Sequence, residues 1–484
     1  MEEAQDKFEP EWIWPDDEGT NVYAQGYGRD LTVIFSFSSD KRNPPTSLAN
    51  RLYTKYEELN ADDEIENEDP ATTFPTINEA HTAIWRAIHH IWPQCISQPD
   101  LRTRLDSVVR VDSVDGSIEK ISWDIYSHPL FPKFVQNLAD KSLGDISGDL
   151  DTAVDFTSLV RYEQLGGRGC TTRVRLPGVD GYWAFKGVDF RTALHYSDNE
   201  GDSIIRNLIY TWHQECNTLQ RLPSHPNILP PPQKLVTLKW PDGLAQPVIC
   251  GALSPFYPGG TLASRIEESN KTGVRISLEL KARWCANMAA AMLHTHRVAK
   301  TYHKDLKPGN FVADENDNLI LCDWEQQDAN PVTLAPEADR TWDVSTGDLP
   351  TAPSGRPQLQ YSKYSGPPRR NVQEAVLGDA PWHLWNVFSL WALEQPWALE
   401  LAEVFSLGRT MWILLRQPDS DFEDIEHPDE LVTDWGGSED IPAAWKQTID
   451  RFISRDPNKR PDFSELSEFW VNEWNTLKTT NKNG

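Results

Sequence analysis

The sequence has 484 residues, of which 39% are apolar, so it is long enough for two or three domains with sizeable buried cores. Its 46 Lys and Arg residues face 73 Asp and Glu residues, giving a formal net charge of −27 and a pI of about 4.8. Because such a charge repels phosphate backbones and anionic lipid, we expect neither nucleic acid nor a membrane surface as a partner.

Cysteine spacing and hydropathy indicate the expected compartment. The six cysteines are scattered without a C-x-x-C pair, so the sequence predicts neither a zinc site nor a disulfide framework. No window of 18 apolar residues occurs, and the amino terminus begins Met1-Glu2-Glu3 without the basic segment of a secretory signal. We therefore expect an intracellular protein of the cytoplasm or the nucleus.

Residues 1–150 carry no catalytic motif, and their apolar patterns predict a small α+β region. Apolar residues alternate over 31–37, as on a half-buried strand, and recur at helical spacing over 77–92. Two further apolar runs flank Asp115-Gly116 and predict a hairpin with a type I′ turn. The acidic tract 62–70 is compatible with a solvated loop and with an acidic docking segment.

A glycine-rich segment and a short strand-like run follow in the chain. Gly167 and Gly169 would let the backbone approach phosphate groups closely, although a G-x-G between strands is also typical of a plain hairpin turn. Residues 182–186 form the strand-like run, which ends in Lys186. Since a lysine at a strand end is commonly only solvated, neither feature identifies a site by itself.

One short loop then gathers three polar side chains that suit phosphoryl transfer. A carboxylate (Asp305), an ammonium (Lys307) and an amide (Asn310) lie close together in the sequence, and Pro308 prevents a helix there. The apolar residues before Asp323 predict a short buried strand that would bring this second carboxylate to Asn310. We therefore expect Asn310 and Asp323 to hold a magnesium ion and Asp305 to accept a proton.

The run His303-Lys304-Asp305-Leu306-Lys307-Pro308-Gly309-Asn310 resembles the catalytic loop H-R-D-L-K-P-x-N of the eukaryotic protein kinases, with Lys304 in place of arginine. The resemblance extends over roughly residues 156–475. It implies an α+β, bilobal fold with an extra N-terminal α+β region at 1–150. The expected boundaries are a small β-rich lobe with its hinge at 151–262, a mainly helical large lobe at 263–475 and a C-terminal tail at 476–484.

The resemblance also assigns residues to catalysis and to ATP. Lys186 would bridge the α- and β-phosphates and pair with Glu215, joining Asp305 and Lys307 in the catalytic set. Thr172 stands where the family has its third glycine. The implied ATP-binding residues lie on the glycine-rich loop, two strands and the hinge: Gly167, Gly169, Val174, Ala184, Lys186, Pro255 and Tyr257.

Five residues would serve structural roles: His303, Trp324, Glu337, Glu403 and Arg460. Glu403, in place of the family's aspartate, would hold the catalytic-loop backbone by buried hydrogen bonds. Glu337 and Arg460 would form a mostly buried ion pair. Trp324, in place of the D-F-G phenylalanine, would pack between Leu219 and His303.

The interval 338–397 is rich in proline and polar residues, and we expect an insertion with little regular structure. Just before it, Ala335-Pro336-Glu337 matches the family's A-P-E, either as the true end of an activation segment or by chance.

These matches imply an ATP- and magnesium-dependent serine/threonine kinase that acts on a protein substrate. The departures at Thr172, Glu403 and Asp323-Trp324-Glu325 leave open a pseudokinase that serves as a nucleotide-binding or scaffold module. A kinase of a small-molecule alcohol is the third alternative, but such enzymes usually lack the Leu306-Lys307-Pro308 run.

Overall fold

A computed structural model represents the chain and describes residues 8–15, 21–28, 31–60, 71–113, 120–139, 153–165, 171–188, 190–195, 201–239, 247–327, 329–346, 357–366, 387–419, 422 and 424–482. The architecture is mixed α+β, as expected. The chain divides into two compact units, Met1–Trp212 with Pro232–Phe256 and His213–Pro231 with Tyr257–Gly484. No helix in the described ranges is long and apolar enough to cross a membrane.

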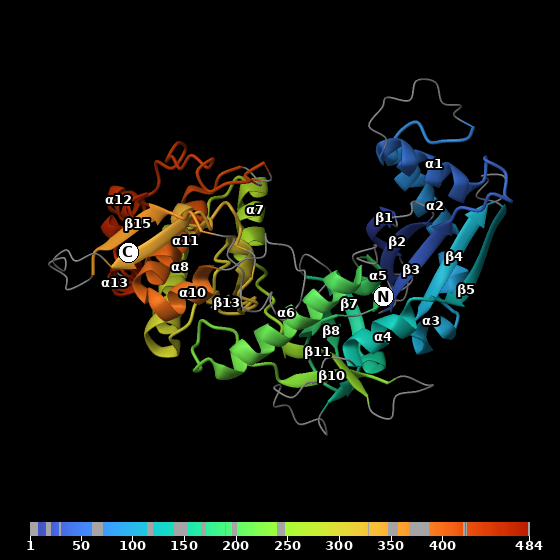
Figure 1. Cartoon of the computed structure of the whole chain (residues 1–484), viewed down its shortest axis with the longest axis horizontal. Coiled ribbons are helices and arrows are strands. Elements are labelled where there is room, and N and C mark those ends of the chain that lie inside the picture. The colour runs from blue at the N-terminus through green and yellow to red at the C-terminus, as the bar shows by residue number, and fades with distance from the viewer. Residues whose placement is uncertain are drawn as a thin grey trace. The chain divides into compact units, whose positions relative to one another are not determined.

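The first unit begins with a five-stranded sheet in the order β1-β2-β3-β4-β5 (Figure 1). Its strands are β1 (Glu9–Pro15), β2 (Asn21–Gly28), β3 (Leu31–Ser38), β4 (Ser107–Ser113) and β5 (Ile121–Ser127). Neighbouring strands are antiparallel except β3 and β4, which run parallel. The helices of this region are α1 (Leu48–Asn60), α2 (Ile77–Cys95), α3 (Asp100–Thr103) and α4 (Phe131–Ala139).

Helix α2 forms where helical spacing predicts it, and its N-terminus is capped because the Thr76 side chain accepts the backbone N–H of Glu79. The prediction of a half-buried strand over 31–37 is wrong, because β3 is covered on both faces. Val33 and Phe35 pack in one apolar cluster with residues of α1 and α2. Ile34 belongs to a separate apolar cluster, which also contains Phe134 and Phe185. The expected hairpin is present as β4 and β5, but its turn and the acidic tract 62–70 lie outside the described residues.

A second, six-stranded sheet completes the first unit, in the order β6-β10-β11-β9-β8-β7. Its elements are β6 (Val154–Asp155), β7 (Val160–Gln164), β8 (Thr171–Arg175), β9 (Trp183–Gly187), β10 (Lys234–Leu238) and β11 (Val248–Pro255), with helices α5 (Phe190–His195) and α6 (Gly201–Arg221). The division between the units falls within α6, after Trp212.

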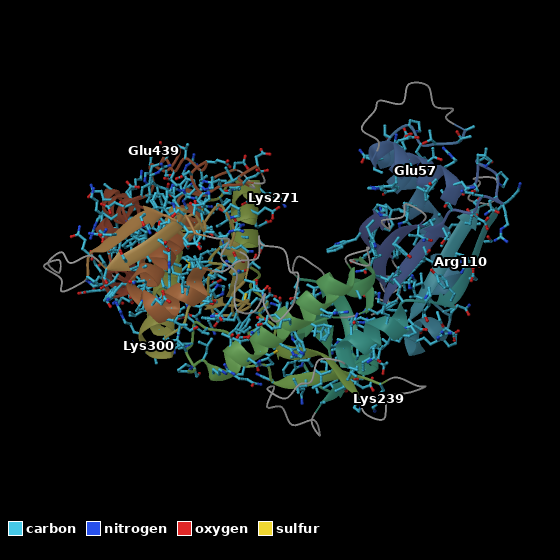
Figure 2. The ribbon with its side chains drawn as sticks, viewed as in Figure 1. Glu57, Arg110, Lys239, Lys271, Lys300 and Glu439 are labelled. Carbon is cyan, nitrogen blue, oxygen red and sulfur yellow. The ribbon has the colours of Figure 1, made fainter. Side chains whose placement is uncertain are left out.

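The two sheets of the first unit share one apolar core. Ile34 and Val108 from the first sheet pack in the same cluster as Phe134 of α4, and Phe185 and Val236 of the second sheet belong to that cluster as well. The N-terminal region expected at 1–150 therefore lies in the same compact unit as the second sheet. Charged side chains such as Glu57 and Arg110 lie on the exposed surface of this unit (Figure 2).

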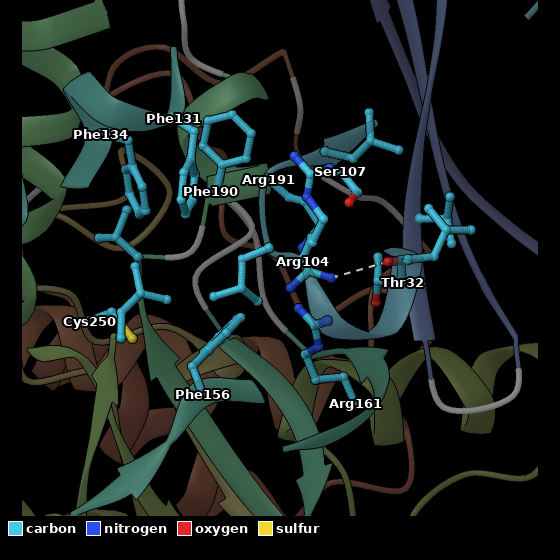
Figure 3. A pocket seen from close by; sticks show the side chains of 16 residues that line it. Thr32, Arg104, Ser107, Phe131, Phe134, Phe156, Arg161, Phe190, Arg191 and Cys250 are labelled. Carbon is cyan, nitrogen blue, oxygen red and sulfur yellow. Dashed lines mark hydrogen bonds between the residues drawn. The ribbon is translucent and has the colours of Figure 1, made fainter. Parts of the chain in front are cut away.

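A small cavity in the first unit lies between its two sheets (Figure 3). Strand β3 and the segment after α3 line one side, whereas β7, α4, α5 and β11 line the others. Four phenylalanines, Phe131, Phe134, Phe156 and Phe190, form much of its apolar wall.

The second unit is mainly helical. Its helices are α7 (Leu262–Thr272), α8 (Leu278–His294), α10 (Val387–Glu394), α11 (Pro396–Arg416), α12 (Ala443–Phe452) and α13 (Phe463–Lys482), and its strands are β12 (Phe311–Ala313), β13 (Leu319–Leu321), β14 (Trp342–Thr346) and β15 (Leu359–Lys363). Residues of α8, α11, α12 and α13 form a common apolar core. Residues 476–482, expected as part of a tail, continue α13.

The expectation of little regular structure over 338–397 is wrong for the described part of that interval. Strands β14 and β15 pair antiparallel, and α10 occupies the end of the interval. The physical reason is burial, since Leu359, Phe388 and Trp391 pack in a cluster with Tyr302 and Phe405. Residues 347–356 and 367–386 lie outside the described residues.

The buried His128 predicts a pH dependence of the first unit's stability. Its Nδ1 accepts the backbone N–H of Leu130 at 3.3 Å, its Nε2 lies 3.2 Å from the Tyr23 hydroxyl, and burial lowers its pKa to about 4. The unfolded histidine gains a proton below about pH 6.5, so stability should fall by up to about 3 kcal/mol between pH 6.5 and pH 4. Urea unfolding over this range should show the loss.

His128→Gln should remove this component of the pH dependence, because glutamine does not titrate. His90→Gln, at an exposed histidine of α2, is the matched control and should keep it. An unchanged pH slope in His128→Gln would contradict the assignment.

Candidate functional site

The loop after α8 and the π-helical turn Thr295–Ala299 holds the candidate site, and Asp305 is at its centre. The Asp305 side chain meets three donors. Lys307 Nζ and Asn310 Nδ2 lie 2.6 and 3.0 Å from Oδ2, and the backbone N–H of Asn330 donates to Oδ1 at 3.1 Å. Asp305 is only 6% exposed, so these donors fix the orientation of a largely buried carboxylate.

The local backbone explains why these side chains converge. Pro308 begins a short 3-10 turn, Pro308–Asn310, which brings Asn310 back toward Asp305. Asn310 Nδ2 also donates to the Asp305 carbonyl at 2.8 Å. The Thr410 hydroxyl of α11 donates to the Leu306 carbonyl at 2.9 Å, which ties the loop to the helical core.

Glu403 of α11 holds the start of the loop, as the sequence predicts. Its Oε1 accepts the backbone N–H groups of His303 and Lys304 at 2.8 and 2.6 Å, and its Oε2 lies 2.6 Å from His296 Nε2. The carboxylate is fully buried. Lys304 has a left-handed backbone, φ 79°, a conformation that these hydrogen bonds stabilise.

The turn that carries Asp323 follows β13, which pairs with β12 directly after the loop. The backbone N–H of Cys322 donates to the Asn310 carbonyl at 2.9 Å, and Asp323 has a positive φ of 67°. Carboxylate oxygens of Glu215, Asp323 and Glu325 lie within 4.8 Å of one another. Sequence reasoning included Glu215 and Asp323 but missed Glu325, for which adjacency to Asp323 was the only signal.

The carboxylates of Glu215, Asp323 and Glu325 offer a metal ion only oxygen atoms. An oxygen-only donor set suits magnesium, whereas soft metals prefer sulfur or imidazole ligands. Because Nδ2 of Asn310 donates to Asp305, Oδ1 is the atom of that amide able to act as a ligand. Acidic clusters of this kind are also common without an ion.

Trp324 fills an apolar slot next to the loop. Its ring lies 4.8 Å from that of His303 at an interplanar angle of 70°, and it belongs to the same core cluster as Leu219. Its backbone N–H donates to Glu215 Oε1 at 3.2 Å, and Nε1 donates to the Leu321 carbonyl. The helix that carries Glu215 and the Asp323 turn are therefore joined within the second unit.

Three polar anchors of the following segment were not identified from the sequence. Gln326, with φ 58°, donates its Nε2 to the Tyr302 carbonyl at 2.6 Å. Asn330 supplies the N–H to Asp305, and Arg409 donates to the Val332 carbonyl at 2.8 Å. Burial lowers the pKa of Arg409 to about 10. Their partners are distant in the chain, so no local pattern signals these contacts.

The end of this segment carries the predicted ion pair. Glu337 and Arg460 form a bidentate pair, with Nη2 to Oε2 at 3.0 Å and a second contact between Nη1 and Oε1. The Arg460 side chain is completely buried, and Nη1 also donates to the Leu401 carbonyl at 3.0 Å. Thr333, in the same segment, is buried with 2% exposure.

The other expected ATP-binding residues lie mostly in the first unit. Val174 lies on β8, Ala184 and Lys186 lie on β9, and Pro255 ends β11. Lys186 pairs in register with Thr171 and Ala252. Gly167 and Gly169 lie outside the described residues. Lys186 belongs to the first unit and Glu215 to the second, so the pairing of these two residues stays a prediction.

Tyr257 is the first residue of the second unit after β11. Burial raises the pKa of its hydroxyl, and the nearby Asp314 and Cys322 act in the same direction.

A scan against models of protein families and a search of curated proteins each found no match for this chain.

The Glu337–Arg460 pair predicts a large loss of stability when one partner is removed. Glu337→Gln leaves the Arg460 charge buried without its counter-ion, so unfolding in urea should show a loss of about 3–5 kcal/mol. The double variant Glu337→Leu with Arg460→Met removes both charges and should lose much less than the sum of the single changes.

Arg455→Ala is the control, because the Arg455–Asp429 pair at 3.1 Å is exposed. It should cost no more than about 1 kcal/mol. Equal losses in Glu337→Gln and Arg455→Ala would contradict the importance of the buried pair.

Proposed function

We propose that this protein is an ATP- and magnesium-dependent protein serine/threonine kinase of the eukaryotic type. The observation that carries the proposal is the arrangement of Asp305, Lys307 and Asn310 on one hydrogen-bonded loop, with Asp323 on the turn that follows. In this proposal the second sheet of the first unit is the small lobe, the second unit is the large lobe, and the enzyme works in the cytoplasm or nucleus.

The chain's residues take separate roles in the proposed reaction. Asp305 accepts the proton of the protein hydroxyl, and the donors at both of its oxygens fix the orientation of the carboxylate. Lys307 balances the charge of the phosphoryl group as it passes from ATP to the hydroxyl oxygen. Lys186, with Glu215, would position the α- and β-phosphates.

Magnesium, when bound with ATP, would neutralise the charge of the phosphate oxygens. Asn310 and Asp323 would hold it, and the cluster adds Glu325 as a further oxygen donor close by. Glu215 is oriented by the N–H of Trp324, which couples the helix carrying Glu215 to the position of Asp323.

Nucleotide binding gives the first test. A ligand at 100 times its dissociation constant stabilises the folded state by about 2.7 kcal/mol, so millimolar ATP with magnesium should raise the melting temperature. Magnesium with AMP, which lacks the β- and γ-phosphates, is the matched ligand control. No shift with Mg-ATP would reject both the kinase and a nucleotide-binding pseudokinase.

Asp305→Asn tests the proposed base. This change should leave ATP affinity nearly intact and lower turnover of labelled ATP into protein by about two to four orders of magnitude, the usual contribution of a positioned base. Glu439→Gln, at an exposed carboxylate of the second unit, should not change turnover.

Equal losses of ATP affinity and turnover in Asp305→Asn would mean that the loop has another role. ATP binding without measurable turnover in the unaltered protein would favour the pseudokinase.

A further inference from the structure

Segment 329–338, which follows the turn of Asp323, reaches the catalytic loop through one backbone group. The Asn330 N–H donates to Oδ1 of Asp305 at 3.1 Å. Lys307 and the Asn310 side chain both approach the other oxygen, Oδ2. The contact at Oδ1 therefore comes from segment 329–338, so the position of this segment bears on the orientation of the Asp305 carboxylate.

Asn330 begins a tight turn within the segment. Its Oδ1 accepts the backbone N–H of Val332 at 2.9 Å, which is the pattern of an Asx turn. Its carbonyl accepts the backbone N–H groups of Thr333 and Leu334 at 3.0 and 2.9 Å. The turn fixes Asn330 and Val332 relative to each other, so a group that holds the Val332 carbonyl also holds the Asn330 N–H.

Arg409 of α11 is the group that holds this carbonyl. Its Nη1 donates to the Val332 carbonyl at 2.8 Å, and its Nη2 donates to the Pro428 carbonyl at 2.7 Å. The guanidinium carbon also lies 4.7 Å from the centre of the Phe405 ring. Because a guanidinium is planar and its donors point in fixed directions, two hydrogen bonds from different nitrogens fix both backbone segments against α11.

The two hydrogen bonds of Arg409 are made by a buried charge. The residue is only 5% exposed, and burial lowers its pKa to about 10, which still leaves it protonated at neutral pH. Hydrogen bonds from an ionised donor are about twice as strong as those between neutral groups. Added phosphate groups order loops by pairing with arginine, whereas here the arginine binds the main chain directly.

The segment also offers little opportunity for phosphorylation. Thr333 is the only serine, threonine or tyrosine in the sequence from Asp323 to Ala338. Its side chain is buried, and its hydroxyl donates to the Asn330 carbonyl at 3.4 Å. Another enzyme could reach this hydroxyl only after the turn had opened.

We infer that Arg409 is a positioning residue, which acts through Val332 and the Asn330 N–H to keep Asp305 in its working orientation. This inference rests on the proposed kinase function and adds its mode of regulation. The contact between Arg409 and Val332 takes the place of a phosphate, so turnover does not depend on phosphorylation of segment 329–338.

Arg409→Met in the full chain tests this role, because methionine fills similar space without donating hydrogen bonds. We expect kcat per folded molecule to fall by about 10- to 100-fold, the effect of a misplaced reacting group, while KM for ATP stays unchanged. Asn330→Ala is the second variant, in case Arg409→Met fails to fold. It removes the acceptor within the turn and should also lower kcat.

Arg416→Met is the matched control. Arg416 lies on the same helix and is half-buried, but it pairs with Asp434 at 3.5 Å instead of contacting segment 329–338. It should leave kcat per folded molecule unchanged. Equal falls of kcat in Arg409→Met and Arg416→Met would overturn the inference.

Phosphorylation is tested on the unaltered protein by peptide mass spectrometry alongside the turnover assay. We expect the active protein to carry Thr333 without phosphate. Turnover that rises in proportion to the phosphate found on Thr333 would contradict the inference.

Hydrogen–deuterium exchange gives a readout that does not need activity. Amides of segment 329–338 should exchange faster in Arg409→Met and in Asn330→Ala than in the unaltered protein, and at the original rate in Arg416→Met. If the unaltered protein shows no turnover, faster exchange still supports the role of Arg409 in holding the segment, and the failure is that of the kinase proposal. Turnover in the unaltered protein with the same exchange in all variants would reject the role of Arg409.

Discussion

The buried carboxylate of Glu403 is the interaction on which the candidate site depends. One oxygen accepts two consecutive backbone N–H groups, those of His303 and Lys304, and the other meets His296. A buried carboxylate is costly unless such donors surround it, and the donors in turn lose their water on burial. The network is therefore stable only when it is complete, and its completion fixes the left-handed residue that precedes Asp305.

The same logic extends outward from the loop. Gln326 and Arg409 bind main-chain carbonyls of Tyr302 and Val332, and Asn330 presents its N–H to Asp305. These contacts come from one side-chain amide, one guanidinium and one backbone N–H, and none of them depends on phosphorylation of the chain. Trp324 occupies the apolar slot against His303, so that polar anchors and apolar packing act on the same short segment.

The first unit uses a different principle, a core shared by two sheets. Apolar residues of β3, α4 and the second sheet pack into one cluster, so the N-terminal sheet gains much of its burial from the other sheet.

The sequence by itself determined the features that depend on local spacing and residue chemistry. Asp305, Lys307 and Asn310 could be identified because they lie close together in the sequence around Pro308, which begins a tight turn there. Helix α2 was predictable from its apolar period, and the Glu337–Arg460 pair followed from the family resemblance.

Only the tertiary structure decided that β3 is covered on both faces, because alternation along a strand does not reveal a second sheet packed on its other side. It likewise decided that Glu325 joins Glu215 and Asp323, that Gln326 binds the Tyr302 carbonyl and that part of 338–397 folds, since each depends on contacts between segments far apart in the chain.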